Sequence, residues 1–143
     1  MITPATPADA PAVIALWHLC GLTRPWNDPA SDYDRALSGP SSAILVSRAQ
    51  GTGAIIGSVM IGHDGHRGWV YYLAVDPDQQ GRGVGAALMA AAEQWLAQRA
   101  VPAIRLMVRS DNAQAMGFYA GLGYERQDVV TLGRNISSKG GAR

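Results

Sequence analysis

The sequence is poor in cysteine and in net charge, and both shortages exclude classes of protein. Its 143 residues include one cysteine, Cys20, so no disulfide can form within one chain, as is usual in the reducing cytoplasm. The 12 basic residues nearly balance the 11 acidic ones, which leaves no basic stripe for a nucleic-acid partner. No apolar run approaches the ~20 residues that cross a bilayer. We therefore expect a cytoplasmic protein, a monomer or a homodimer, without a nucleic-acid or membrane partner.

The remaining composition is that of one compact domain. Hydrophobic residues make up 48% and charged residues 16% of the chain, which is ordinary for a globular protein. A chain of about 150 residues buries roughly 68–70% of its unfolded surface and needs neither disulfide nor metal to fold. We expect a single domain over residues 1–136 and a flexible, polar tail over residues 137–143.

The hydrophobic pattern predicts elements in the order α, α, β, β, β, α, β, α, β, with a short strand at Ile2 before them. The helices are expected to run from Thr6 to Cys20, from Asp28 to about Gly39, from about Gly83 to Arg99, and from Asp111 or Asn112 to Leu122. The strands are expected over residues 44–46, 55–61, 69–75 and 103–108, with one or two more after Tyr124 that include Val129, Val130 and Leu132. Hairpins followed by helical crossovers predict a mixed sheet of the α/β (α+β) class.

Three glycines stand at the start of the third predicted helix, at Gly81, Gly83 and Gly85. Each costs ~1 kcal/mol relative to alanine inside a helix. This cost indicates that the backbone at these positions must be free of side chains. Helix first turns favour acids, yet the first acid after Gly81 is Glu93. An external anion of the size of a pyrophosphate suits the unpaired N–H groups there, with Arg82 beside it. The alternative is a tight strand–helix turn in which the glycines only permit close packing.

Other phosphate-binding patterns fit this loop poorly. No Gly-Lys-Ser/Thr follows, so the Walker pattern is absent. The dinucleotide fingerprint can be placed on Gly81, Gly83 and Ala86, but it requires an acid ~20 residues further on to bind a ribose. Residues 101–105 contain no acid. A nucleotide-binding domain is therefore a weak alternative.

Residues 80–85, QGRGVG, resemble the acyl-CoA signature Q/R-x-x-G-x-G/A of the GNAT acetyltransferases, with Gln80, Gly83 and Gly85 in the defining positions. Residues 2–12, 73–77 and 111–124 resemble further segments of that family in the same order. The resemblance implies the GNAT fold, a central mixed sheet of six or seven strands flanked by about four helices. It also implies an N-acetyltransferase that passes the acetyl group of acetyl-CoA, its co-substrate, directly to a primary amine of a small molecule or a peptide or protein N-terminus, without a metal. More narrowly, residues 24–29 and 64–68 are similar to a small bacterial member of the family.

The resemblance also implies which residues bind the co-substrate. Backbone N–H groups from Arg82 to Ala86 would hold the pyrophosphate, and the backbone of Leu73 and Val75 would pair with the pantetheine arm, as an exposed strand edge can do. Asn112 would hydrogen-bond the same arm. The implied binding residues are Leu73, Ala74, Val75, Gln80, Gly81, Arg82, Gly83, Val84, Gly85, Ala86 and Asn112.

Tyr119 occupies the family position of the general acid. It lies at helical spacing from Asn112 and Met116, on one face of the predicted helix. A phenol with a pKa near ~10 stays protonated at neutral pH and can protonate a thiolate whose conjugate thiol has a pKa of ~8.5. The alternative is that Tyr119 packs in the core beside Phe118.

Two loops with dense functional groups are expected to form the acceptor pocket. The expected lining residues are Arg24, Trp26, Asn27 and Asp28 on one wall and Asp64, His66 and Arg67 on the other. Acids would attract an ammonium and an arginine would hold a carboxylate, which favours a small zwitterion or a peptide end. The alternative is that Trp26 covers the core and the Asp64-Gly65 pair only turns the chain.

Three further questions stay open in the sequence. The general base that deprotonates the amine has four candidates, Asp28, His63, Asp64 and His66. The histidines at 63 and 66 with Asp64 provide too few ligands for a closed metal site. A non-catalytic acyl-CoA sensor of the same fold is the alternative function, against which Tyr119 and Asn112 argue, because a binding module needs only the glycine loop.

Overall fold

The computed structural model describes residues 1–136, so the tail expected over residues 137–143 lies outside the described residues. The chain divides into two compact units, Met1–Val108 and a second that begins at Arg109. The single domain over residues 1–136 therefore stays a prediction. Within the described part of the chain, no helix is long and apolar enough to cross a membrane.

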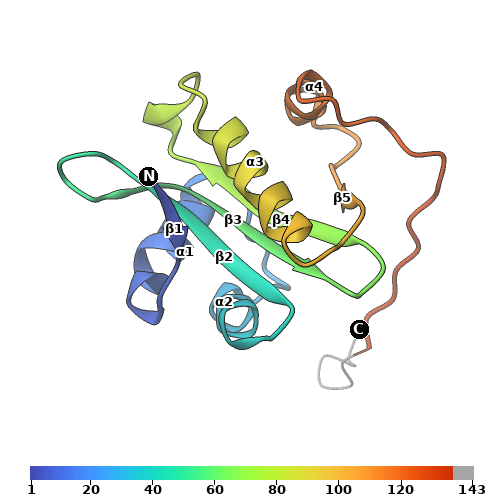
Figure 1. The fold of residues 1–143 in the computed structure, drawn as a ribbon, viewed down its shortest axis with the longest axis horizontal. Helices are drawn as coiled ribbons and strands as arrows, with labels where there is room; N and C mark the ends of the chain where they lie inside the picture. The colour runs from blue at the N-terminus through green and yellow to red at the C-terminus, as the bar shows by residue number, and fades with distance from the viewer. Residues whose placement is uncertain (137–143) are drawn as a thin grey trace. The chain divides into compact units, whose positions relative to one another are not determined.

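The first unit is built on a mixed sheet of five strands in the order β1-β2-β3-β4-β5 (Figure 1). The strands are β1 (Ile2–Pro4), β2 (Ser42–Arg48), β3 (Ile55–His63), β4 (Gly68–Val75) and β5 (Ile104–Leu106). The first four pair antiparallel, whereas β5 runs parallel to β4. The parallel pair is joined by a helical crossover, as parallel strands require. The mixed sheet predicted from the hydrophobic pattern is confirmed.

The helices of this unit cover both faces of the sheet. They are α1 (Ala10–Leu19), α2 (Pro29–Ser38) and α3 (Val84–Ala97), with short 3-10 turns at Pro7–Asp9 and Pro77–Gln79. A Cβ placed on Gly57 would meet side chains of α3, whereas the neighbouring Ser58 accepts a hydrogen bond from Trp17 of α1. Because successive strand residues point to opposite faces, α3 lies on one face and α1 on the other.

The core between the sheet and α1–α2 is centred on Trp17. Its indole ring is fully buried, and its Nε1 donates to Ser58 Oγ at 3.2 Å, so the one polar atom of the ring is satisfied. Tyr33 of α2 lies beside it and donates its hydroxyl hydrogen to the Thr6 carbonyl at 2.6 Å. These contacts fix the positions of both helices against the sheet.

The second unit contains α4 (Ala113–Gly121), and the prediction of further strands after it is wrong. Residues 125–136 form neither helix nor strand, and Val129, Val130 and Leu132 are exposed. Strand propensity reflects packing against a partner strand and a buried face, and these side chains have neither in the described chain. The expected count of six or seven strands is therefore reduced to five over residues 1–136.

The N-terminal helix start yields a prediction on stability. Asp9 accepts hydrogen bonds from the Thr6 N–H at 2.9 Å and from the Arg48 guanidinium at 2.7 Å, with 13% of its side chain exposed. The bond from Arg48 is the main reason that the pKa of Asp9 is lowered. Asp9→Asn is expected to destabilise the protein by about 1.5–3 kcal/mol at pH 7, the value of one charge-assisted hydrogen bond.

The pH dependence of that loss follows from the direction of the shift. Since the folded-state pKa of Asp9 lies below its ordinary value of 3.8, its stabilisation is complete above pH 3.8 and is lost as the pH falls through the lowered pKa. Urea unfolding of wild type and variant should therefore differ at pH 7, and the difference should shrink as the pH falls below 3.8. Asp111→Asn, which removes an exposed ion pair to Arg109, is the control and should have almost no effect. An Asp9 variant as stable as wild type at pH 7 would contradict this account.

Candidate active site

The glycine loop opens α3 with a backbone shaped to receive an anion. Gly81 and Gly83 have φ angles of 80° and 82°, in the left-handed region that side chains rarely adopt. The first backbone hydrogen bond of α3 runs from Ala87 N to Gly83 O, so the N–H groups of residues 84–86 precede the helical ladder. No acidic side chain stands in the first turn of α3, and a Cβ on Gly83 would meet no atom within 4 Å. Within residues 1–136, these N–H groups therefore have no helical acceptor, and the space beside Gly83 is open.

Among residues 1–136, no strand pairs with one edge of the second half of β4. The ladder to β5 extends only from the Gly68–Ile104 pair to the Val70–Leu106 pair. Asp76 donates its N–H to Ile56 of β3, at 2.8 Å, and backbone groups alternate along a strand, so the N–H groups of Leu73 and Val75 point away from β3. On that same side the carbonyl of Val75 accepts from the Cys20 thiol at 3.3 Å. A strand-like ligand could pair with this edge.

A bulge in β4 stands where this open edge begins. Ser58 pairs with Ala74 and Met60 pairs with Tyr71, so Val59 alone lies opposite both Tyr72 and Leu73. Tyr72 has a φ of 53°, a positive value that is a genuine outlier for a bulky residue. The extra residue shifts the alternation of the strand by one, so Tyr71 and Tyr72 both face the α1–α2 side.

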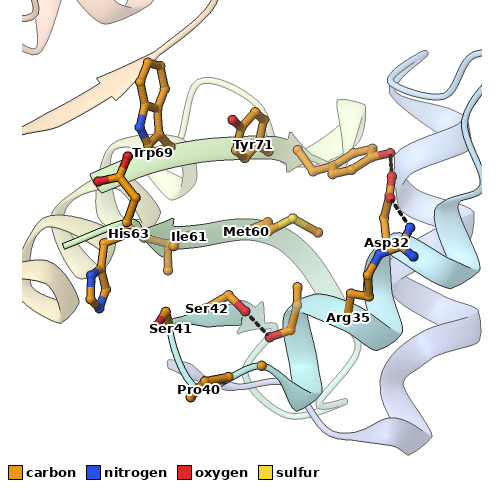
Figure 2. Close-up of a pocket in the computed structure, with 15 residues that line it drawn as sticks. Asp32, Arg35, Pro40, Ser41, Ser42, Met60, Ile61, His63, Trp69 and Tyr71 are labelled. Carbon is orange, nitrogen blue, oxygen red and sulfur yellow. Dashed lines mark hydrogen bonds and ion pairs between the residues drawn. The ribbon is translucent and has the colours of Figure 1, made fainter. Parts of the chain in front are cut away.

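On that side lies a cavity of about 600 Å³, which we call the α2 groove (Figure 2). It is lined by Asp32, Arg35 and Ala36 of α2, by residues 39–42 and 60–64, and by Trp69, Tyr71 and Tyr72 of β4. In Figure 2, Asp32 and His63 mark its two ends, and Trp69 and Tyr71 lie along the β4 side.

The Asp32 end of the groove is a small polar cluster. The Tyr72 hydroxyl donates to Asp32 Oδ2 at 2.7 Å, and Arg35 lies 3.6 Å from Asp32 Oδ1. Burial and the neighbouring Asp32 carboxylate together raise the pKa of Tyr72 well above its ordinary range, so it remains a neutral donor. The Tyr72 ring stacks on Trp17 with centroids 3.9 Å apart. The core therefore fixes the direction in which Tyr72 holds Asp32.

In the second unit, Asn112 caps α4 and Tyr119 lies within it. Asn112 Oδ1 accepts from the Ala115 N–H at 3.0 Å, which leaves the amide NH₂ as its remaining donor. Tyr119 is half-buried, with ring contacts to Phe118 and Tyr124 at 5.0 and 5.8 Å between centroids. Burial raises the pKa of its hydroxyl, which keeps the proton that a general acid must supply.

The predicted acceptor wall at residues 24–28 is held by local structural contacts. The Arg24 guanidinium donates to the carbonyls of Gly21 and Thr23, and Asn27 N donates to Arg24 O. Asp28 caps α2 by accepting from the backbone and side chain of Ser31, which lowers its pKa. Trp26 is 76% exposed, so it does not cover the core. None of these residues lines the α2 groove.

The other predicted wall is the β3–β4 hairpin. Asp64 Oδ1 accepts from the N–H groups of His66 and Arg67, both at 2.9 Å, which lowers the pKa of Asp64 and forms the turn. Asp64 also lines the α2 groove, whereas His66 and Arg67 do not. Within residues 1–136, no group of three or more histidine, cysteine or acidic side chains could hold a metal ion.

The comparisons with known proteins now decide the family. Residues 12–124 match the model of the acetyltransferase (GNAT) family. The chain is 49% identical over 128 residues to an acetyltransferase of Pectobacterium atrosepticum, which covers 90% of this chain and 89% of the relative. It is 47% identical over 129 residues to an acetyltransferase of Yersinia enterocolitica, which covers 90% of each. The chain belongs to the GNAT family.

This GNAT protein is an enzyme, an acetyltransferase, which answers the question of a non-catalytic sensor raised by the sequence. Its fold is also that of the family. The solved aminoglycoside N-acetyltransferase AAC(6')-Iy superposes with a TM-score of 0.81, at 18% identity, covering 96% of this chain and 98% of that one. The predicted mixed-sheet GNAT fold is confirmed, with the five strands described above.

Sequence reasoning missed most of the α2 groove of this GNAT enzyme. Asp32, Met60 and Tyr72 belong to no sequence motif that marks them as site residues. Regular strand alternation would place the adjacent Tyr71 and Tyr72 on opposite faces of the sheet. Only the bulge, which carries no glycine or proline signal, places Tyr71 and Tyr72 on one face. Two consecutive tyrosines in a half-buried strand were the one available hint.

Proposed function

We propose that this acetyltransferase uses acetyl-CoA and transfers its acetyl group directly to a primary amine of a small molecule or of a peptide or protein N-terminus. The observation that carries the proposal is the pair formed by the glycine loop and the open edge of β4 within one unit. AAC(6')-Iy was solved in complex with a bisubstrate analogue that contains CoA, which supports the same co-substrate here.

The backbone of this chain fits the two parts of CoA that differ most in chemistry. The pyrophosphate is an anion, and the N–H groups from Arg82 to Ala86 would hold it, with the bare Gly81 and Gly83 allowing close approach and Gln80 and Arg82 beside it. The pantetheine arm carries amides, and the edge of Leu73, Ala74 and Val75 would pair with them as an added strand. The Asn112 amide would hydrogen-bond the same arm.

The acetyl-CoA thioester supplies an activated acetyl group. The amine nitrogen, after it has lost a proton to solvent or to a base, forms a bond to the carbonyl carbon. The nitrogen then releases a second proton to solvent, the carbon–sulfur bond breaks, and the electron pair leaves on the CoA sulfur, which gives the neutral amide. Tyr119 would donate its proton to that sulfur, and a backbone N–H of the Leu73–Val75 edge would polarise the carbonyl.

Several finer expectations belong to the same proposal. The seven acceptor-wall residues named from the sequence stay candidates, with Asp64 the one that lines the α2 groove. Residues 24–29 and 64–68 support a narrower kinship with the bacterial acetyltransferase YpeA. We also propose a single domain over residues 1–136 and a cytoplasmic monomer or homodimer.

A turnover assay tests the proposed function. The purified chain is mixed with acetyl-CoA and each amine of a panel, and free CoA thiol and N-acetylated product are measured together. The proposal predicts equal amounts of thiol and product with at least one amine. Binding of NAD with no binding of CoA, measured by calorimetry, would overturn it.

A further inference from the structure

The α2 groove is polar at its ends and apolar between them. Asp32 and Arg35 stand at one end and His63 at the other, and Asp64, the next residue in the chain, also lines the groove. Met60 lies near the middle, where Figure 2 shows its side chain between the two ends. Three residue steps along β3, from Met60 to His63, correspond to about 10 Å. A ligand that fills the groove is therefore elongated, with an apolar body.

The aromatic side of the groove is built by the β4 bulge. Trp69, Tyr71 and Tyr72 all line the groove from one strand, and the positive φ of Tyr72 is needed to bring the last two together. Strain of this kind costs of order 1–3 kcal/mol and clusters at functional sites. Aromatic faces of this type attract organic cations as well as apolar groups.

The charge at the Asp32 end favours a cation as well. The Asp32 side chain is 32% exposed and that of Arg35 is 77% exposed, so the 3.6 Å ion pair between them is a weak surface contact. The 2.7 Å bond from Tyr72 occupies one acceptor position of the carboxylate. A carboxylate offers about four such positions, so an incoming ammonium can still bind Asp32.

The same end of the groove lies next to the open edge of β4. Tyr72, which holds Asp32, is followed directly in the chain by Leu73, whose N–H points away from β3. An amine bound at Asp32 is therefore closer along β4 to the proposed thioester position than an amine bound at His63. The acceptor is therefore expected to lie with its amine at the Asp32 end and its body toward His63.

We propose that the α2 groove is the acceptor site, that it takes primary amines with an aromatic or similarly apolar body, and that Asp32 anchors the reacting ammonium. This inference rests on the proposed acetyl transfer. It differs from the zwitterion expected from the sequence, because the aromatic lining of the groove favours an apolar body beside the ammonium.

Matched amines test the inference. Acetylation by wild type is measured with 2-phenylethylamine, with phenylalanine, which adds a carboxylate beside the amine, and with n-butylamine, which lacks the ring. The value of kcat/KM should be highest for 2-phenylethylamine. A higher value for phenylalanine or n-butylamine would overturn the inference while leaving acetyl transfer intact. No turnover of acetyl-CoA with any amine, together with no binding of CoA, would instead overturn the proposed function.

Two variants locate the site. Asp32→Asn keeps an oxygen that accepts from Tyr72, and it should raise KM for 2-phenylethylamine roughly 10- to 100-fold with unchanged CoA affinity. Asp34→Asn, on the same helix but outside the groove, is the charge-matched control and should behave as wild type. Tyr71→Ala should lower the preference for 2-phenylethylamine over n-butylamine, which a loss of stability alone would not do. Equal effects of the Asp32 and Asp34 variants, or an unchanged preference in the Tyr71 variant, would overturn the site.

Discussion

Replacing Tyr119 with phenylalanine is expected to slow acetyl transfer by roughly 10²- to 10⁴-fold while leaving the affinity for CoA nearly unchanged. The substitution removes only the hydroxyl, so the ring contacts with Phe118 and Tyr124 are kept. Without that hydroxyl the CoA sulfur must leave as a thiolate or take a proton from water. Single-turnover kinetics with saturating acetyl-CoA measure the chemical step, and calorimetry measures the affinity.

The pH profile of the wild type gives a second measure of the same role. Burial raises the pKa of Tyr119 above its ordinary value of 10.0. The hydroxyl therefore keeps its proton at neutral and mildly alkaline pH. Activity should therefore show no loss attributable to Tyr119 between pH 7 and about pH 9. A Tyr119→Phe enzyme with wild-type single-turnover rates would show that Tyr119 is only a packing residue.

Replacing Gly83 with alanine is expected to weaken CoA binding by about 10- to 100-fold. The new Cβ meets no protein atom within 4 Å, so it occupies space that the proposed pyrophosphate needs. Losing one charge-assisted hydrogen bond to phosphate, worth about 1.5–3 kcal/mol, accounts for a change of this size. Calorimetric titration with CoA measures the effect.

Backbone strain alone must be separated from this loss of binding. Gly51, in the β2–β3 turn, has a φ of 86° and also has no atom within 4 Å of an added Cβ. Gly51→Ala therefore imposes the same left-handed strain away from the glycine loop, and thermal unfolding should show similar destabilisation for both variants. Its CoA affinity should match wild type. Equal CoA affinities for the two variants would rule out the glycine loop as the phosphate site.

Local signals in the sequence predicted where three of the helices begin. Asp28 caps α2, Gly83 caps α3 and Asn112 caps α4, and each was recognisable from side-chain chemistry or conformational freedom at one position. The glycine loop belongs to this class, because its chemistry lies in consecutive backbone groups.

Features that depend on distant partners were not predictable in the same way. The α2 groove requires Asp32 of one helix to meet Tyr72 of a strand 40 residues away, and it requires a bulge without a sequence signal. The site residues predicted from the polar loops at 24–28 and 64–67 include Asp28 and Asp64, whose carboxylates already accept structural hydrogen bonds. The expected strand at Val129 and Val130 failed for a similar reason, since propensity cannot supply a partner strand.

The most direct test of the central claim is amide hydrogen exchange, measured by NMR with and without CoA. The account predicts that CoA slows exchange at Val75 and at residues 84–86, whose N–H groups lie on the open β4 edge and at the start of α3. The Asp76 amide, already bonded to Ile56 at 2.8 Å, should change little and serves as the internal reference. Unchanged exchange at Val75 and residues 84–86 under saturating CoA, or protection confined to other parts of the chain, would contradict the account.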